Sequence, residues 1–171
     1  PRVPLLIATW ILGTYVHTRF KYFGYLWIHS PVKRCGKTDL LRIIKALAWR
    51  SSNILIDPTP AILFNRVDEG CTVLTDEMEN LKDSNKARFG AMMAIFNAGF
   101  SEGATVPRMH KGAVKEYSVY GPKAIAGINT VTDTIRDRSF SIKLQRKTRE
   151  EKTEPLNMRI VGSVFESYKA S

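Results

Sequence analysis

A turn containing Gly-Lys-Thr joins an apolar run to a helical pattern near the start of the chain. The apolar run is Tyr25–Ile28, and the turn is Pro31–Thr38 (PVKRCGKT). After the turn, apolar residues recur at spacings of three and four residues from Leu40 to Leu47, which is typical of a helix with one buried side. A strand that passes through a tight turn into a helix favours the α/β class, in which helices cover a parallel sheet.

The turn has the spacing of a P-loop, although Pro31 stands where the usual pattern opens with glycine. In such a loop, backbone N–H groups and a helix N-terminus face the phosphates of a nucleotide. Gly36 would let the backbone approach, Lys37 would lie near the β and γ phosphates, and Thr38 would join a Mg²⁺ shell. The alternative is a strand-turn-helix that contains Gly-Lys-Thr by chance. The predicted nucleotide-binding residues are Pro31, Val32, Lys33, Arg34, Cys35, Gly36, Lys37, Thr38 and Asp39.

A second motif follows about forty residues later. Cys71–Thr75 is a short run with β-branched residues, and Asp76 and Glu77 come directly after it. A buried strand that ends in two carboxylates is what a Walker B element requires. Asp76 would hold Mg²⁺, directly or through water, and Glu77 would polarise the attacking water. The alternative is a strand that leads into a solvated acidic loop.

Strand and helix patterns alternate along the rest of the chain, which predicts a parallel sheet wrapped by helices. Helices are expected at about 4–17, 37–49, 60–67 and 82–98. Sheet strands are expected at about 25–29, 53–56, 71–75, 123–128 and 139–144. A hairpin is expected from arms at 104–108 and 114–120, and a short turn at 132–134.

Capping residues and composition place the boundaries. Thr59 and Pro60 suit the N-cap and first position of a helix, and Asn97-Ala98-Gly99 suits a helix C-terminus. We expect a P-loop ATPase core with an N-terminal helix at 1–145, and a charged linker with the start of a C-terminal helical region at 146–171. In the latter, Leu156, Ile160, Val161, Val164, Phe165 and Tyr168 mark an amphipathic helix.

The chain is basic, with a net charge of +10 over 171 residues. This charge favours a polyanionic partner such as nucleic acid, although Lys33, Arg34 and Lys37 account for part of it through the nucleotide site. The longest apolar stretch, Val3–Val16, is too short to span a bilayer, so we expect no membrane partner. Two cysteines make no disulfide framework, and a cytoplasmic location is expected. Because Pro1 is not a natural start, we expect the chain to be a piece of a larger protein.

Several motifs, in order, resemble a group of P-loop ATPases found beside or fused to primases in bacterial, plasmid and phage mobile elements, which belong broadly with AAA+ helicase-like ATPases. The motifs are Ser30–Thr38, Thr75–Glu77, Asn97–Gly99, Gly121–Gly127 and Asp137–Ser139. Proline also stands at the first P-loop position in that group. The resemblance implies an AAA+-like parallel sheet sandwiched by helices, with an inserted β-hairpin and a truncated C-terminal helical lid.

The resemblance also implies roles for residues outside the two motifs. Asn129 is placed like a sensor residue near the γ-phosphate, with a turn residue at a strand end as the alternative. Arg138, or otherwise Arg136, is placed like an arginine finger that acts on a neighbour's nucleotide; the alternative for Arg138 is an ion pair with Asp133 or Asp137. The hairpin would offer nucleic-acid contacts at Arg108, His110, Lys111 and Lys115.

These interpretations lead to three hypotheses on function. The first is a Mg²⁺- and ATP-dependent helicase-like motor on DNA, serving replication of a mobile element as a homo-oligomer, such as a hexameric ring, with a primase partner or fused domain. Its predicted catalytic residues are Lys37, Glu77, Asn129 and Arg138. The second is a nucleotide-dependent switch or assembly ATPase with protein partners and no DNA translocation. The third is a small-molecule kinase, although the chain has no clear substrate lid with clustered arginines.

Overall fold

The computed structural model describes residues 2–77, 86–110, 112–128, 132–148, 150–151 and 156–157. The described helices are α1 (Arg2–Thr14), α2 (Lys37–Leu47), α3 (Pro60–Asp68), α4 (Lys86–Ala98) and α5 (Asp133–Asp137), with a 3₁₀ turn η1 (His17–Arg19). The strands are β1 (Tyr25–Ser30), β2 (Ser51–Ile56), β3 (Thr72–Asp76), β4 (Thr105–His110), β5 (Ala113–Ser118), β6 (Lys123–Ile128) and β7 (Ser139–Lys143).

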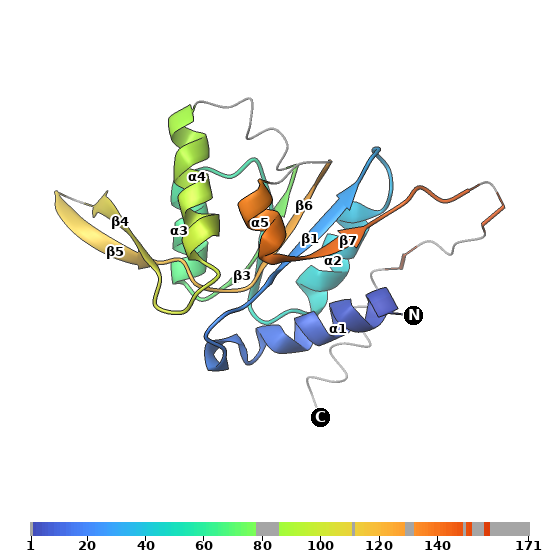
Figure 1. Ribbon diagram of the computed structural model, residues 1–171, viewed down its shortest axis with the longest axis horizontal. Helices are drawn as coiled ribbons and strands as arrows, with labels where there is room; N and C mark the ends of the chain where they lie inside the picture. The colour runs from blue at the N-terminus through green and yellow to red at the C-terminus, as the bar shows by residue number, and fades with distance from the viewer. Residues whose placement is uncertain are drawn as a thin grey trace.

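Five strands form one parallel sheet in the order β2-β3-β6-β1-β7 (Figure 1). The prediction of a parallel sheet flanked by helices is confirmed. Strand β6 lies between β1 and β3, so the strand before the Gly-Lys-Thr turn and the strand before the acidic pair are next-but-one neighbours. All five strands run the same way, and their carboxyl ends therefore meet at one edge of the sheet.

Two apolar cores, one on each face, hold the helices to the sheet. Successive strand residues alternate between them: Tyr25 packs in the cluster with α3 and α4, and Leu26 packs in the cluster with α1 and α2. The predicted stripe of α2 is buried through Leu41 and Ile44, which have no exposed surface. These side chains fix the first turn of α2 against the carboxyl end of β1.

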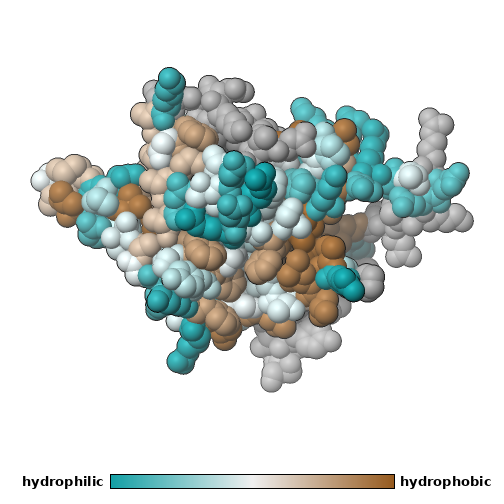
Figure 2. Space-filling model, in the orientation of Figure 1, coloured by the Kyte–Doolittle hydropathy of each residue, from teal (hydrophilic) through white to brown (hydrophobic). Residues whose placement is uncertain are grey.

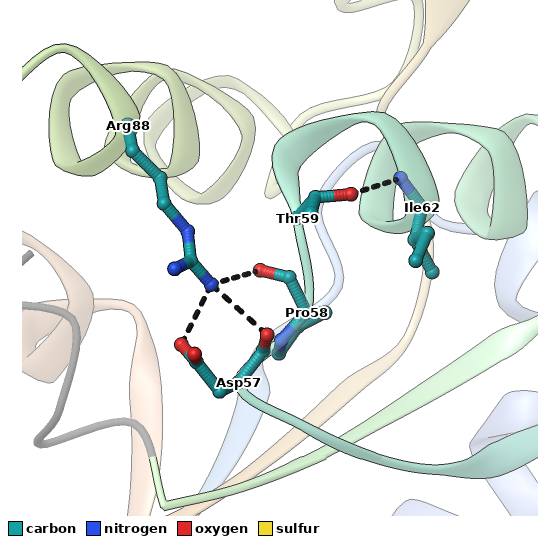
Figure 3. Close-up of polar contacts among 5 residues, drawn as sticks. All are labelled: Asp57, Pro58, Thr59, Ile62 and Arg88. Carbon is teal, nitrogen blue, oxygen red and sulfur yellow. Dashed lines mark hydrogen bonds and ion pairs between the residues drawn. The ribbon is translucent and has the colours of Figure 1, made fainter. Parts of the chain in front are cut away.

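Helix α3 begins as its capping residues predict. The N–H of Ile62 donates to Thr59 Oγ1 at 3.4 Å, and Pro60 opens the helix (Figure 3). Arg88, from α4, donates through one guanidinium nitrogen to the Asp57 carboxylate at 2.6 Å and to the Pro58 carbonyl at 3.0 Å. This arginine ties the start of α4 to the turn between β2 and α3.

The hairpin is a separate antiparallel pair, β4 and β5, that extends away from the sheet (Figure 1). Its base is anchored, because Val106 and Tyr117 face each other and are buried. The ring of Tyr117 lies 4.6 Å from that of Phe64 on α3. One face of the hairpin is thus held against α3.

A fully buried lysine closes the opposite edge of the sheet. Lys123 Nζ, at the start of β6, donates to the carbonyls of Val119 at 2.7 Å, Gly121 at 3.0 Å and Gly99 at 3.3 Å. Burial lowers the pKa of Lys123 to about 7. The three carbonyls belong to the end of α4 and the segment between β5 and β6, so this ammonium joins the hairpin to the core.

One local prediction is wrong. Residues 133–137 form the helix α5, where a turn was expected at 132–134; its five residues are too few to show a helical period in the sequence. The predicted end of a helix at Asn97-Ala98-Gly99 is confirmed, because Ala98 is the last residue of α4. Glycine is required there by space, since a Cβ at position 99 would lie 2.2 Å from the Val119 carbonyl oxygen.

The remaining differences concern element ends. Strand β2 starts at Ser51 and α1 ends at Thr14, within a few residues of the predicted boundaries. The predicted helix at 82–98 is described from Lys86 onward, and the predicted C-terminal helix lies almost wholly outside the described residues. None of the helices in the described parts of the chain has the length and apolarity to cross a bilayer.

Candidate functional site

A cleft lies at the carboxyl edge of the sheet, between the ends of β1 and β3. Lys37 and Thr38 reach it from the first turn of α2, and Asp76 reaches it as the last residue of β3. The hydroxyl of Thr38 donates to Asp76 Oδ2 at 2.9 Å. The two predicted motifs, 38 residues apart, therefore meet through a direct hydrogen bond.

The turn contains two residues with left-handed backbones, a feature of anion-binding loops. Arg34 and Gly36 have φ angles of 63° and 80°, and alternation of such residues with right-handed ones turns successive N–H groups toward one point. A Cβ at Gly36 would meet no atom within 4 Å, so space does not require glycine there. Glycine is favoured because its backbone is left-handed. Within the described parts of the chain, no side chain caps the N-terminus of α2, and the N–H groups of a helix's first turn suit an anion.

A buried serine holds the lysine of the turn. Lys37 Nζ donates to Ser30 Oγ at 2.7 Å, and Ser30 Oγ donates to the Val32 carbonyl at 2.6 Å. Ser30 has no exposed surface. The list of predicted site residues started at Pro31 and missed Ser30; its signal in the sequence is a small hydroxyl residue that ends an apolar strand directly before the turn.

The second carboxylate stands in a strained backbone. Glu77 has a φ of 58°, which is unusual for a residue with a side chain, and its N–H donates to Asp76 Oδ1 at 2.9 Å. The Glu77 side chain is exposed and lines the cleft. Strain of this kind collects at functional sites, because the surrounding structure must hold it.

The cleft has a volume of about 240 Å³, and its lining combines both signs of charge. The lining residues are Lys33, Arg34, Lys37, Thr38, Asp76, Glu77 and Ile128. Three cations on one side suit phosphate groups, and two carboxylates on the other suit a metal ion or a water molecule. Ile128 was not predicted, and it supplies an apolar wall from the end of β6.

The oxygen donors fit Mg²⁺ better than a softer metal. Thr38 Oγ1 and Asp76 Oδ2 already lie 2.9 Å apart, and both are the hard oxygen ligands that Mg²⁺ prefers. Among the described residues, no group of three or more His, Cys, Asp or Glu side chains could hold a metal. One or two protein ligands are what a Mg²⁺ site needs when phosphates and water supply the rest.

A neutral histidine stands next to the cationic turn. His29 stacks on Trp27 at 4.1 Å between ring centroids, and its Nε2 lies 2.9 Å from Ser141 Oγ. Burial, and secondly the charge of Lys143, lower the pKa of His29. His29 therefore adds no charge beside the turn at neutral pH.

Five of the predicted nucleotide-binding residues are not among those that line the cleft: Pro31, Val32, Cys35, Gly36 and Asp39. Asp39 forms an exposed ion pair with Arg42 at 2.8 Å, and the Cys35 thiol donates to the Val32 carbonyl at 3.3 Å. Cys35 and Cys71 are both free thiols. Pro31, Val32 and Cys35 lie in the turn and could contact a ligand through their backbone only, whereas the side chain of Asp39 is exposed on α2.

Other predicted site residues lie elsewhere. Arg138 directly precedes β7, and its carbonyl accepts from the N–H of Tyr25, so it lies at the amino edge of the sheet. Because β1 spans six residues, that edge is about 17 Å from the cleft. The alternative for Arg138 was an ion pair with Asp133 or Asp137. Asp133 instead pairs with Arg136, at 2.9 Å. Asn129 lies outside the described residues.

The hairpin cations lie largely on the face toward α3. Arg108 and Lys115 are cross-strand partners. The guanidinium of Arg108 is 5.8 Å from the ring of Phe64, and Lys115 Nζ is 3.5 Å from Asp68. His110 is exposed at the end of β4, and Lys111 lies outside the described residues. Nucleic-acid contacts were expected at these residues, but the contacts with Phe64 and Asp68 place Arg108 and Lys115 on the side that faces α3.

No protein-family model matches this chain, and a search of curated proteins returns no match.

Proposed function

We propose that this chain is a P-loop ATPase domain that binds and hydrolyses ATP with Mg²⁺. The single observation that carries the proposal is the 2.9 Å hydrogen bond between Thr38 Oγ1 and Asp76 Oδ2. A Mg²⁺ ion shared by a nucleotide, a P-loop hydroxyl and a strand-end carboxylate requires this proximity. The parallel sheet flanked by helices is compatible with the AAA+-like fold that the resemblance implies.

The chain's own residues would divide the work as follows. The turn from Lys33 to Thr38 and the first turn of α2 bind the phosphates through N–H groups and cations. Lys37, preset by Ser30, stabilises negative charge as it develops on the transferred phosphoryl group. Glu77 orients the attacking water from the exposed side of the cleft. Bound Mg²⁺ would supply further charge neutralisation beside Thr38 and Asp76.

Lys37→Ala tests the proposal most directly. Removal of the ammonium should lower ATP turnover by about 10³-fold, since one stabilising group at a site of developing charge is worth on the order of 3–4 kcal/mol. Lys45→Ala is the matched control, because Lys45 lies on the same helix and bonds to Asn53 outside the cleft. Phosphate release measures turnover, and equal rates in the two variants would overturn the proposal.

We further propose that DNA is the partner, because of the net charge of +10 and the projecting hairpin. Turnover of the full chain with and without single-stranded DNA tests this step. A motor on DNA should be stimulated severalfold, and the stimulation should weaken in the variant His110→Ala. Equal turnover with and without DNA would remove DNA from the proposal and leave ATP hydrolysis intact.

One observation favours a second candidate, a nucleotide-dependent switch or assembly ATPase with protein partners. Lys115 and Arg108 are engaged with α3 through Asp68 and Phe64, which reduces the charge that the hairpin offers to phosphates. This candidate predicts self-association that depends on ATP and is unchanged by DNA. Light scattering with each ligand separates it from the motor.

A further inference from the structure

An apolar hollow lies between α1, the segment before β1, and β7. Its volume is about 270 Å³. Figure 2 shows apolar residues gathered over α1 and the neighbouring β7, where the hollow lies. The rings that line it are Trp10, Phe20, Tyr22, Phe23 and Phe140. Clefts for drug-sized ligands begin at about 300 Å³, so the hollow suits a smaller ring system.

Three of these rings keep much of their surface open to solvent. Phe20 and Phe140 are each 46% exposed, and Tyr22 is 54% exposed. Trp10 and Phe23, in contrast, are buried. Single apolar side chains on a surface need no partner, but a group of them around one hollow marks an interaction site.

The backbone fixes the orientation of the exposed rings. Tyr22 forms a β-bridge with Ser101, and its ring stacks on Phe100 with 5.4 Å between centroids and 22° between planes. The ring of Phe140 lies across Gly24, where a Cβ would approach Phe140 Cε2 to 2.8 Å. Because rings that are already ordered lose little entropy on binding, the hollow is preorganised for a flat ligand.

Two cations alternate with the exposed rings, since residues 19–22 read Arg-Phe-Lys-Tyr. Arg19 and Lys21 are exposed, and in the described parts of the chain no carboxylate pairs with either. Lys21 Nζ lies 5.7 Å from the centroid of the Tyr22 ring, so its charge lies beside the hollow. One carboxylate, Glu102, borders this segment through its N–H, which donates to the Lys21 carbonyl at 2.9 Å, and the two cations remain in excess.

An unstacked base with its phosphates matches this combination of rings and charges. Proteins hold single strands by stacking bases on aromatic side chains while cations beside the rings contact the phosphates. A base inside a duplex is covered on both faces and would have to leave the stack to enter such a hollow. An aliphatic partner would gain apolar contact, but it would leave the two cations without a counter-charge.

We propose that the hollow binds a base of single-stranded nucleic acid against the rings of Phe20, Tyr22 and Phe140. Arg19 and Lys21 then lie beside the adjoining phosphates. The hollow is at the amino ends of β1 and β7, and so at the opposite edge of the sheet from the cleft. The inference rests on the proposed nucleic-acid partner, and it depends neither on the hairpin nor on ATP hydrolysis.

Binding of a labelled oligodeoxythymidine of about 12 nucleotides to the full chain without ATP, followed by fluorescence anisotropy, tests the rings. Phe20→Leu keeps an apolar side chain but removes the ring, and it should weaken binding about tenfold through lost stacking. The matched control is Trp49→Leu, which removes a ring that is 44% exposed and lies outside the hollow. It should leave the affinity nearly unchanged. If Phe20→Leu fails to fold, Tyr22→Leu replaces it with the same expectation.

The salt dependence of the same binding tests the cations. On a single strand, each phosphate contact contributes about 0.7 to the slope of log affinity against log salt concentration. Lys21→Gln should therefore reduce the slope by about 0.7. Lys45→Gln should not change it, because Lys45 bonds to Asn53 on α2 and β2, outside the hollow. A purely structural role of Lys21 would leave the slope as it is. A ribonucleotide strand of equal length separates RNA from DNA as the source of the base.

Three results would overturn the inference. If the unchanged chain binds the strand but Phe20→Leu binds it as tightly as Trp49→Leu does, the hollow is not the site and the nucleic-acid partner stands. If the unchanged chain binds no strand, the proposed partner fails as well, and ATP hydrolysis is still judged through Lys37→Ala. If Phe20→Leu changes only the particle mass seen by light scattering, the hollow belongs to a contact between copies of the chain.

Discussion

Two lysines at opposite edges of one sheet differ in how many hydrogen bonds their ammonium groups donate to the protein. Lys123 is fully buried at the amino edge, and its ammonium donates to three carbonyls. Lys37 is half-buried at the carboxyl edge, and among the described residues it has one hydrogen-bond acceptor, Ser30. An ammonium has three donors. The donors of Lys123 are therefore taken by backbone carbonyls of the fold. Lys37 donates to one described acceptor, which leaves donors for a ligand.

The largest difference between the two lysines is expected when each is replaced by methionine in a separate variant. Lys123→Met leaves buried carbonyls without a donor, which should lower the free energy of unfolding by about 3 kcal/mol. Lys37→Met should change it by less than about 0.5 kcal/mol, because the site is exposed to water. Urea unfolding of both variants measures the difference. Equal losses would mean that Lys37 is also a structural residue.

A smaller effect is expected at Gly99, which packs against the Lys123 site. In Gly99→Ala, the new Cβ would approach the Val119 carbonyl to 2.2 Å and Lys123 Nζ to 2.6 Å. We expect a loss of about 2 kcal/mol through backbone displacement. The control is Gly90→Ala within α4, where nothing lies within 4 Å of the new Cβ. That change should stabilise the protein by up to about 1 kcal/mol, and thermal unfolding resolves opposite signs.

The pH dependence of stability sharpens the comparison without a change in the backbone. The pKa of Lys123 falls from 10.5 to about 7 on folding, so between these values the unfolded chain binds more protons than the folded one. The free energy of unfolding should then rise with pH from about 7 toward 10.5, by at most about 1.4 kcal/mol per pH unit. Urea titrations across this range measure the slope. A Lys123→Met chain that keeps the same slope would show that another group causes it.

The smallest expected effect concerns Ser30, the partner of Lys37. Ser30→Ala removes one hydrogen bond from the ammonium, which should weaken ATP turnover by about fivefold, equivalent to about 1 kcal/mol. Ser30→Thr keeps the hydroxyl and should recover part of the loss. Steady-state kinetics of the two variants and the unchanged chain measure the effect. If Ser30→Ala turns over ATP as fast as the unchanged chain, Ser30 has no positioning role.

Much of the fold could be predicted because its signals are local. Thr59 and Pro60 start α3 as their capping chemistry requires, and Leu41 and Ile44 are buried as the period of α2 implies. The meeting of Thr38 and Asp76 could also be anticipated, because parallel strands bring their carboxyl ends to one edge. Each of these inferences needs only residue type and spacing.

The rest depends on register and distant neighbours, which one sequence does not reveal. The sequence marks Lys123 as an ordinary charge beside an apolar strand, and nothing in it shows that three carbonyls converge there. Arg108 and Lys115 were predicted to contact nucleic acid, but both lie against α3, through Phe64 and Asp68. Ser30 was missed because its importance comes from the hydrogen bond to Lys37.

The position of Arg138 constrains any assembly in which it completes a catalytic site. It lies about 17 Å from the cleft of its own copy, so it would have to serve the cleft of another. Contacts that join unlike surfaces generate closed circles or open filaments. In a closed circle every cleft receives an arginine, whereas an open filament always leaves one cleft without its arginine. Under the arginine-finger proposal, activity per copy would then depend on closure and would rise steeply with concentration.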